Sequence, residues 1–365
     1  MNPKRPIWYL PEKDLVQVID QRKLPHVFEV FDIKNCDDTV YAIKNMVVRG
    51  APLIGVTAAW GFYMSLKGSN AEDNVVFELE KKINSSRPTA MNLFYATKKV
   101  RAAVLKETFA DKRIEAAKRA AEEIEAAEIY NCRKIGEFGV SLIEDIYSYK
   151  KDVVNILTHC NAGWLACVEY GTATSPIYHA HEKGIPVHVW VDETRPLNQG
   201  ARLTAWELDQ AKVPYTVIAD NTGGHLMQHD LVDIVIVGSD RTTINGDVAN
   251  KIGTYLKALA ARDNRIPFYA ALPGSTIDFE LENGVKNIPI ELRNEDEIKY
   301  IEGLGSKGVE KFLITLENAH AANYAFDVTP ARLVTGIITE KGIARAEKDD
   351  LLRLFPEYRY NRLHN

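Results

Sequence analysis

Residues 231–255 have the sequence LVDIVIVGSDRTTINGDVANKIGTY. The first seven residues are mostly apolar and rich in β-branched side chains, which predicts a buried β-strand ending at Gly238. Asp240 then lies just past the carboxyl end of that strand, where open α/β sheets place their ligands. The segment therefore indicates an α/β fold and offers a first candidate acid/base group.

The second half of this segment predicts an anion site. An Asn-Gly pair at 245–246 indicates a turn, and Asp247 is expected to cap a helix over Val248–Ala261. Asn250 and Lys251 would then lie in its first turn, where free N–H groups and the helix dipole favour an anion. The alternative is an ordinary surface loop before a capped helix. The position of the segment directly after a buried strand favours the anion site over the surface loop.

Composition limits the classes of function. A chain of 365 residues is long enough for two domains, and 46% hydrophobic and 26% charged residues are ordinary for a soluble globular protein. The net charge of -5 comes without a long basic run, so nucleic acid is not an expected partner. No apolar run has transmembrane length, and Met1–Leu10 has no signal-peptide core. We expect no membrane association.

The four cysteines are Cys36, Cys132, Cys160 and Cys167, and they form no C-x-x-C pair. So few cysteines in a large chain suggest free thiols in a reducing cytoplasm, although a disulfide between two of them stays open.

Two domains are expected from the change in pattern near residue 150. Residues 1–150 combine short strands with helices, including a buried helix over Leu53–Leu66, and are expected to form a small, mostly helical N-terminal domain. Residues 151–365 alternate strand and helix, which predicts a Rossmann-like domain with a parallel, doubly wound sheet. The expected elements of this second domain are strands at 153–157, 187–191, 215–218, 231–237 and 268–272, with helices that include 164–181 and 201–211, and residues 336–339 are expected to end the ordered core.

Polar residues follow four of these strands: Cys160-Asn161, Asp192-Glu193, Asp220-Asn221 and Asp240. The carboxyl ends of parallel strands meet at one edge, so these side chains are expected to share a cleft. Cys160 precedes an expected helix N-terminus, which would lower the pKa of its thiol. The alternative for Cys160 is a small buried hydrophobic residue.

Two arginines precede expected helices. In the RGAP sequence at 49–52, Gly50 permits a close ligand approach and the following proline suits a first helical turn. Arg49 is either a structural ion-pair partner or a phosphate ligand helped by the N–H groups of Gly50 and Ala51. Arg87 in SRPTA (residues 86–90) repeats the arrangement and is either part of the same anion site or exposed.

Several common motifs are absent from the sequence: G-x-G-x-x-G after the first strand of the second domain, Walker A, H-E-x-x-H and G-x-S-x-G. His225 and His229 have the spacing that places two metal ligands on one helix face, but no third ligand with characteristic spacing accompanies them.

Taken together, the ordered motifs resemble the methylthioribose-1-phosphate isomerase family. This family is related to the α, β and δ regulatory subunits of the initiation factor eIF2B and to ribose-1,5-bisphosphate isomerase. The resemblance covers nearly the whole chain. The motifs that carry it are DQRKLP (20–25), RGAP (49–52), SRPTA (86–90), HCNAG (159–163), VDETRP (191–196), QGAR (199–202), the Asp240 segment and AFDVTP (325–330).

The resemblance implies a homodimer that acts on a small sugar phosphate without a metal or organic cofactor. It implies catalytic roles for Cys160 and Asp240. It further implies contacts with substrate and phosphate for Arg49, Gly50, Ala51, Arg87, Gln199, Asn250 and Lys251. The chain departs from the family pattern at Tyr324, where proline is usual, and at Trp164 and Cys167 after the N-A-G sequence; Trp164 bears on substrate choice.

The implied reaction converts 5-methylthioribose 1-phosphate to 5-methylthioribulose 1-phosphate in methionine salvage. Asp240 is expected to move protons at the ring and hydroxyl oxygens, for which burial would have to raise its pKa. Cys160 would act either as the base of an enediol route or as a polar stabiliser of a hydride shift. Arg49, Arg87 and Lys251 would hold the phosphate.

Other members of the superfamily define the alternatives. A non-catalytic regulator would be expected to lack the Cys160 and Asp240 pair. Ribose-1,5-bisphosphate isomerase needs a second phosphate site, for which no further basic cluster is evident. A 5-deoxyribose-1-phosphate isomerase differs only in the size of an apolar pocket, a difference that discriminates substrates by about 1–3 kcal/mol.

Overall fold

The computed structural model describes residues 5–87 and 91–360. The chain divides into two compact units, Met1–Arg133 with Gly163–Gly171, and Lys134–Ala162 with Thr172–Asn365. The division differs from the single boundary expected after residue 150. One change of unit lies inside α5, a continuous helix over Ala110–Lys150, and the segment 163–171 belongs to the first unit.

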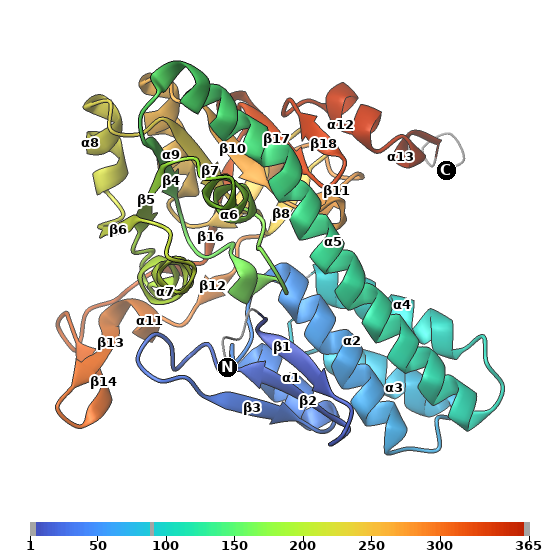
Figure 1. The fold of residues 1–365 in the computed structure, drawn as a ribbon. Coiled ribbons are helices and arrows are strands. Elements are labelled where there is room, and N and C mark those ends of the chain that lie inside the picture. Colours follow the sequence, from blue (N-terminus) through green and yellow to red (C-terminus); the bar gives the residue numbers. More distant parts are fainter. Residues whose placement is uncertain (1–4, 88–90, 361–365) are drawn as a thin grey trace. The chain divides into compact units, whose positions relative to one another are not determined.

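The first unit combines a small antiparallel sheet with helices (Figure 1). Its strands are paired in the order β1-β2-β3. The bounds are β1 Ile7–Leu10, β2 Leu15–Ile19, β3 Val30–Ile33, α1 Cys36–Lys44, α2 Ala51–Lys67, α3 Asp73–Asn84, α4 Met91–Val104, the first part of α5, and a 3-10 turn η1 at Trp164–Ala166.

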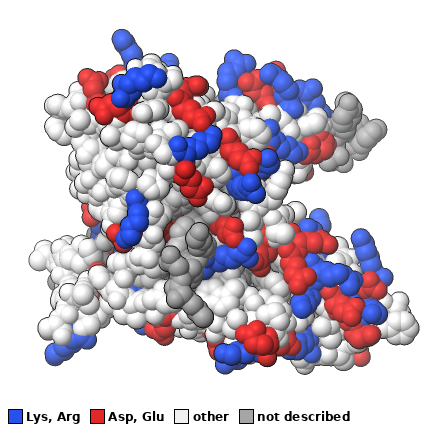
Figure 2. All heavy atoms as spheres, viewed as in Figure 1, with Lys and Arg blue, Asp and Glu red and all other residues white. Residues whose placement is uncertain are grey.

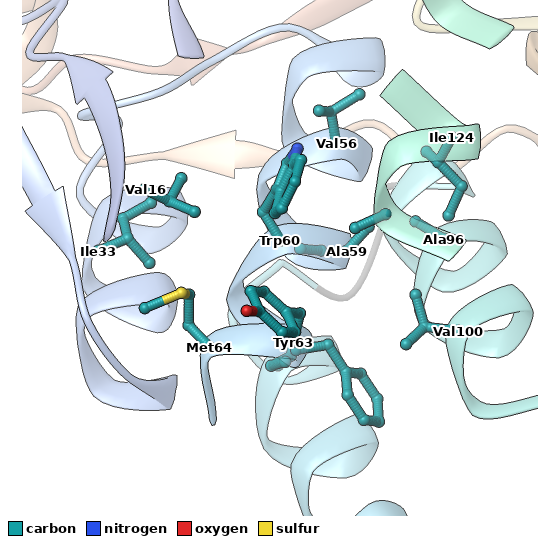
Figure 3. Close-up of a cluster of buried hydrophobic side chains, with 14 of the residues drawn as sticks. Val16, Ile33, Val56, Ala59, Trp60, Tyr63, Met64, Ala96, Val100 and Ile124 are labelled. Carbon is teal, nitrogen blue, oxygen red and sulfur yellow. The ribbon is translucent and has the colours of Figure 1, made fainter. Parts of the chain in front are cut away.

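Helix α2 forms the centre of this unit. It is apolar on nearly all sides, as expected for Leu53–Leu66, and nearly all of its side chains are buried. Figure 3 shows Trp60 and Tyr63 of α2 among side chains from the neighbouring strands and helices. Burial of each large apolar side chain stabilises the fold by about 1.5–3 kcal/mol, so the α2 core holds the first unit together.

The second unit contains a seven-stranded sheet in the order β18-β17-β10-β7-β4-β5-β6. All neighbouring strands are parallel except the edge strand β18, which pairs antiparallel with β17. The predicted α/β class with a parallel-rich sheet is thus confirmed. The bounds are β4 Val154–Thr158, β5 Val187–Asp192, β6 Tyr215–Ile218, β7 Ile234–Val237, β10 Phe268–Ala271, β17 Gly336–Thr339 and β18 Gly342–Ala344.

Helices cover both faces of this sheet. A Cβ on Gly223 of α8 would meet Leu157 of β4, whereas a Cβ on Gly139 of α5 would come within 3.4 Å of Ile338 of β17. Ile337 lies in the same core cluster as Leu157, and successive strand residues face opposite sides, so α5 and α8 lie on opposite faces. The helices are α6 Ser175–Glu182, the π-helical turn η2 Gly200–Thr204, α7 Ala205–Ala211, α8 Thr222–Gln228, α9 Thr254–Asp263, α12 Lys348–Leu354 and α13 Glu357–Tyr360.

A four-stranded sheet in the order β11-β8-β9-β16 follows the carboxyl end of β7. Its strands are β8 Arg241–Thr243, β9 Val248–Lys251, β11 Ile277–Asp278 and β16 Phe326–Thr329. The remaining elements are η3 Gly274–Thr276, α10 Gly284–Asn287, β12 Leu292–Arg293, α11 Asp296–Lys299, the hairpin β13 Tyr300–Gly305 with β14 Gly308–Leu313, β15 Asn323–Tyr324 and η4 Ala331–Leu333.

The expected helix over Val248–Ala261 is wrong in its first half. Residues 248–251 form strand β9, which pairs antiparallel with β16, and α9 begins only at Thr254 after Gly253 at φ 102°. Asp247 does not cap this helix. Its carboxylate accepts from the N–H groups of Gly284 and Ala331. Residues 248–251 form a strand because they pair with β16, which is 74 or more residues away along the chain. The local periodicity of the sequence does not show this distant pairing.

The expected helix over residues 164–181 is also wrong in part. Only η1 and α6 are helical there, with irregular chain between them. Tyr170 and Gly171 both have positive φ, which ends any helix, and the N–H of Thr172 donates to Ala162 O. The helix expected near Leu333 is a three-residue 3-10 turn.

Two further sequence expectations concern membranes and thiols. None of the helices within residues 5–87 and 91–360 has both the length and the apolar character needed to cross a bilayer. All four cysteines are free and buried, which decides the open question of a disulfide. In Figure 2, basic and acidic side chains of the described residues lie next to one another where they occur on the visible face.

Candidate active site

Cys160 lies directly after strand β4, at the carboxyl edge of the parallel sheet. Its backbone is left-handed, at φ 67°, a conformation that costs a non-glycine residue about 1–3 kcal/mol. Two threonines hold it there. Its N–H donates to Thr194 Oγ1 at 2.9 Å, and its carbonyl accepts from Thr204 Oγ1 at 2.7 Å. Such strain persists only where the surroundings fix it, which is typical of functional sites.

The loop after β5 is fixed by Asp220. The Asp220 carboxylate accepts from the N–H groups of Thr194 and Arg195, both at 2.7 Å. A Cβ on Gly200 would lie 1.7 Å from Asp192 O, so only glycine fits at the start of the following helical turn. These contacts fix the position of the preceding residue, Gln199.

Gln199 is 6% exposed, and its side-chain oxygen Oε1 has no hydrogen-bond partner among the described residues. A buried acceptor without a partner costs about 1–3 kcal/mol. A ligand hydroxyl that donates to Oε1 would remove this cost. Gln199 therefore has a polar atom available for substrate.

Asp240 lies after β7, the strand next to β4 in the sheet. The two strand ends are close, because a Cβ on Gly238 would lie 2.6 Å from the Ala162 side chain. The N–H of Asp240 donates to Ala249 O at 2.9 Å, and Arg241 is opposite Ala249 in the β8–β9 register. Asp240 is therefore next to Asn250, and its side chain is half-buried.

Asn250 and Lys251 lie on β9 and not at a helix N-terminus. Both are buried, at 5% and 8% exposure. Asn250 Nδ2 donates to Thr254 Oγ1 at 3.1 Å, and Lys251 Nζ lies 5.0 Å from the centre of the Phe326 ring. A buried ammonium favours a nearby anion, so Lys251 remains a candidate anion ligand for a different reason than predicted.

A buried charged cluster lies behind Cys160. His159 Nδ1 is 2.8 Å from Asp192 Oδ2, and His159 Nε2 is 2.8 Å from Ile252 O. Lys257 Nζ lies 3.1 Å from the same Asp192 oxygen and also donates to Asp220 O. The cluster contains the only His/Asp group within the described chain with metal-ligand spacing, namely His159, Asp192 and Asp220.

The composition of this cluster does not fit a metal ion. The Lys257 ammonium already supplies a positive charge beside the Asp192 carboxylate, the Asp220 carboxylate already accepts from two backbone N–H groups, and both ring nitrogens of His159 already face protein oxygens. The His225 and His229 pair contributes to no such group of three among the residues described, so the structure gives it no support as a metal site.

Asp327 on β16 borders the same cluster. Burial raises the pKa of its carboxyl, while the N–H groups of Gly253 and Tyr255 and the charges of His159 and Lys257 lower it. The two N–H bonds have lengths of 2.7 and 3.1 Å, and they cap the start of α9.

In the first unit, Gly50 precedes α2 at φ 91°, and a Cβ there would lie 2.4 Å from Ala166 O. Glycine is therefore required. Because Gly50 provides no side-chain cap, the first N–H groups of α2 are available to an anion. Arg49 and Ala51 flank Gly50, and both are half-buried. The close contact with Ala166 also orders the segment that contains Trp164.

Arg87 is half-buried and follows Ser86, whose hydroxyl donates to Ile83 O. The proline predicted to open the next helix lies outside the described residues, together with residues 89 and 90. The helix itself is present as α4.

The structure thus brings Cys160, Asp240, Asn250 and Lys251 to one edge of the second unit. Gln199 is held beside the neighbouring strand β5, because Gly200, the residue after it, packs against Asp192 O at the end of that strand. Arg49, Gly50, Ala51 and Arg87 belong to the first unit. The sequence reasoning missed Thr194, Thr204, Lys257 and Asp327. Thr194 and Asp327 had a signal, namely their places within the VDETRP and AFDVTP motifs.

Comparison with known proteins shows the family of the chain. The family model described as "Initiation factor 2 subunit family" matches residues 47–346. A methylthioribose-1-phosphate isomerase of Desulfosudis oleivorans is 58% identical over 98% of both chains. One of Methylorubrum extorquens is 53% identical, again over 98% of both chains.

Two solved structures are similar over nearly the full length. A 5-methylthioribose 1-phosphate isomerase from Pyrococcus horikoshii OT3 has a TM-score of 0.83 and 37% identity, and covers 97% of this chain and 96% of its own. A structure described as translation initiation factor eIF-2B subunit delta from A. fulgidus has a TM-score of 0.81 and 35% identity, with 96% and 99% covered. On this identity and coverage, the chain belongs to the methylthioribose-1-phosphate isomerases of the Initiation factor 2 subunit family.

Proposed function

We propose that this protein is an aldose–ketose isomerase that converts 5-methylthioribose 1-phosphate to 5-methylthioribulose 1-phosphate, a step of methionine salvage. The observation that carries the proposal is the position of Cys160, held in a strained backbone at the sheet edge that also presents Asp240. The identity of 51–58% to curated isomerases over nearly the whole chain supports it.

Asp240 serves as the acid/base group at the oxygens. The anomeric oxygen carries the phosphate, so the ring cannot open as it does in a free aldose. The protonated Asp240 carboxyl donates to the ring oxygen as the bond between that oxygen and C1 breaks. The resulting carboxylate then accepts the proton of the C2 hydroxyl as the ketone forms. The half-buried position of Asp240 gives it access to both oxygens.

Cys160 serves the transfer of hydrogen from C2 to C1, and two routes remain. In the enediol route, the thiolate removes the proton from C2 while the ring bond breaks, and the thiol returns a proton to C1. In the hydride route, the hydrogen moves with its electron pair from C2 to the electron-poor C1, and Cys160 only stabilises the polar transition state. Turnover in D2O separates them: deuterium at C1 of the product supports the enediol, and full retention of a C2 label excludes exchange and supports the hydride shift.

The buried Lys251 ammonium and Asn250 amide bind the phosphate or sugar next to Asp240, and Gln199 Oε1 accepts from a sugar hydroxyl. Arg49, Arg87 and the N–H groups of Gly50 and Ala51 complete the phosphate contacts. No metal or organic cofactor takes part in these steps. The protein acts as a cytoplasmic homodimer, for which its free thiols and the exposed apolar side chains of β13–β14 are the supporting observations.

The test is turnover by the purified protein, followed by appearance of the ketose 1-phosphate. Cys160→Ser and Asp240→Asn are expected to lower kcat by at least about 10²-fold, since general acid–base groups contribute about 10²–10⁴-fold. Cys167→Ser changes a buried thiol of similar size in the first unit and is expected to retain activity. Full activity of either site variant would contradict the proposed roles.

A further inference from the structure

We propose that His159 is a positioning residue that couples the Cys160 backbone to the strand of Lys251. The inference rests on the proposed function for its kinetic readout, but its structural basis is independent. His159 is fully buried, directly precedes Cys160, and makes one hydrogen bond with each ring nitrogen.

Both partners of the His159 ring are acceptors. Nδ1 faces Asp192 Oδ2 and Nε2 faces the carbonyl oxygen of Ile252, each at 2.8 Å. The ring of His159 is therefore held through both of its nitrogens.

The ring of His159 lies in a cluster of charged side chains. Asp192 comes from β5 and Asp220 follows β6, and the ligand atoms of these two residues and His159 lie within 4.8 Å of one another. Lys257 projects from α9 to Asp192, and Asp327 on β16 interacts electrostatically with His159 and Lys257. Three carboxyl groups and the Lys257 ammonium thus lie around the buried ring and restrict its position.

The two bonds connect separate parts of the candidate site. The Nδ1 bond fixes the end of β4 to the end of β5, next to the strained Cys160. The Nε2 bond fixes the same ring to Ile252, which directly follows Lys251 on β9. The ring is also packed against Gly253, where a Cβ would lie 3.2 Å from its atoms. A shift of His159 would therefore move the thiol and the ammonium relative to each other.

Two substitutions separate the two bonds. In His159→Asn, the amide nitrogen lies near the position of Nδ1, so the bond to Asp192 is retained and the bond to Ile252 is lost. In His159→Gln, the amide reaches the position of Nε2, so the bond to Ile252 is retained and the bond to Asp192 is lost. The matched control is His229→Asn, which changes an exposed histidine on the same unit.

We expect a split in the kinetic constants. His159→Asn releases the strand of Lys251 and should raise KM about tenfold with a smaller change in kcat, whereas His159→Gln disturbs Cys160 and should lower kcat about tenfold. The alkylation rate of Cys160, followed by peptide mass spectrometry, should change more in His159→Gln than in His159→Asn. His229→Asn should match the wild type in all three quantities.

Equal effects of the two variants on both kinetic constants, or wild-type values in both, would overturn the coupling role. Thermal unfolding of each variant identifies a loss of folded protein, which would lower kcat alone and equally in both. If the wild type turns over no substrate, the proposed function fails, but the alkylation rates still decide whether His159 positions Cys160.

Discussion

At the scale of single residues, the positions of Cys160 and Asp240 at one edge of the sheet could be predicted from the sequence, because the carboxyl ends of parallel strands meet there. The backbone strain of Cys160 could not, because it depends on Thr194 and Thr204, which come from other elements. Lys251 lies on strand β9 and not in the first turn of a helix, where the sequence predicted it. A local motif identifies the chemistry of a side chain, whereas its surroundings depend on contacts distant in sequence.

Gln199 provides a prediction at this scale. Gln199→Leu keeps the side-chain volume but removes the unpaired Oε1, so substrate loses a hydrogen bond. We expect KM to rise about 5- to 100-fold, equivalent to about 1–3 kcal/mol, and the free energy of unfolding to stay equal or increase. Steady-state kinetics and urea unfolding measure the two quantities. An unchanged KM would show that Oε1 does not bind substrate.

Gly50 provides a second prediction at the scale of single residues. Gly50→Ala places a Cβ within 2.4 Å of Ala166 O and forces an L-residue to φ 91°. We expect a loss of more than about 1 kcal/mol of stability in the first unit, together with lower activity. Denaturant unfolding of Gly50→Ala, compared with Gly184→Ala at a positive φ with open space around it, measures the cost of the clash itself. Equal destabilisation of the two variants would show that φ alone matters.

At the scale of elements, the alternation of strand and helix was enough to predict the parallel sheet and most of its strands. It failed at β9, since four apolar and polar residues before a helix are compatible with an extra helical turn. Pairing of β9 with β16 decides the matter, and the partner strand lies 74 or more residues away.

Asp327 on β16 gives a prediction with a defined pH dependence. Asparagine accepts through one oxygen, so Asp327→Asn leaves one of the Gly253 and Tyr255 N–H groups without its partner. We expect it to destabilise the protein by about 1–3 kcal/mol.

Burial raises the pKa of Asp327 in the folded state, so the protonated carboxyl stabilises the folded protein relative to the unfolded chain. This stabilisation is fully present below the ordinary aspartate pKa of about 3.9 and is lost as the pH rises through the raised pKa of the folded state. The difference in unfolding free energy between wild type and Asp327→Asn should therefore decrease from pH 4 towards neutral pH. Urea unfolding at several pH values measures it. A difference that grows with pH would indicate a lowered pKa.

At the scale of the whole molecule, two units were expected, but the position of the division was not. The sequence of α5 has no break near residue 133, so nothing local marks the change of unit, and the return of residues 163–171 depends on contacts such as that of Gln21 Nε2 with Leu165 O.

The proposed homodimer is tested on the β13–β14 hairpin. Leu304 in the hairpin is 66% exposed and Leu316 just beyond it is 78% exposed, and the hairpin also exposes Val309, Phe312 and Leu313. Leu304→Asp with Leu316→Asp should convert the dimer to a monomer, whereas Leu256→Asp on α9, exposed to a similar degree, should not. Light scattering after size exclusion gives the mass. A dimer that survives both charges would place the interface elsewhere.

The proposed substrate is tested most directly by turnover with the purified wild-type protein. The three sugar phosphates compared side by side are methylthioribose 1-phosphate, 5-deoxyribose 1-phosphate and ribose 1,5-bisphosphate. We expect the highest kcat/KM for the methylthio sugar, by about 10-fold or more over the deoxy sugar, since a larger apolar group contributes about 1–3 kcal/mol in its pocket. Equal or better use of the deoxy sugar would contradict the proposed substrate. No turnover of any of the three would contradict catalysis itself and favour a regulatory role.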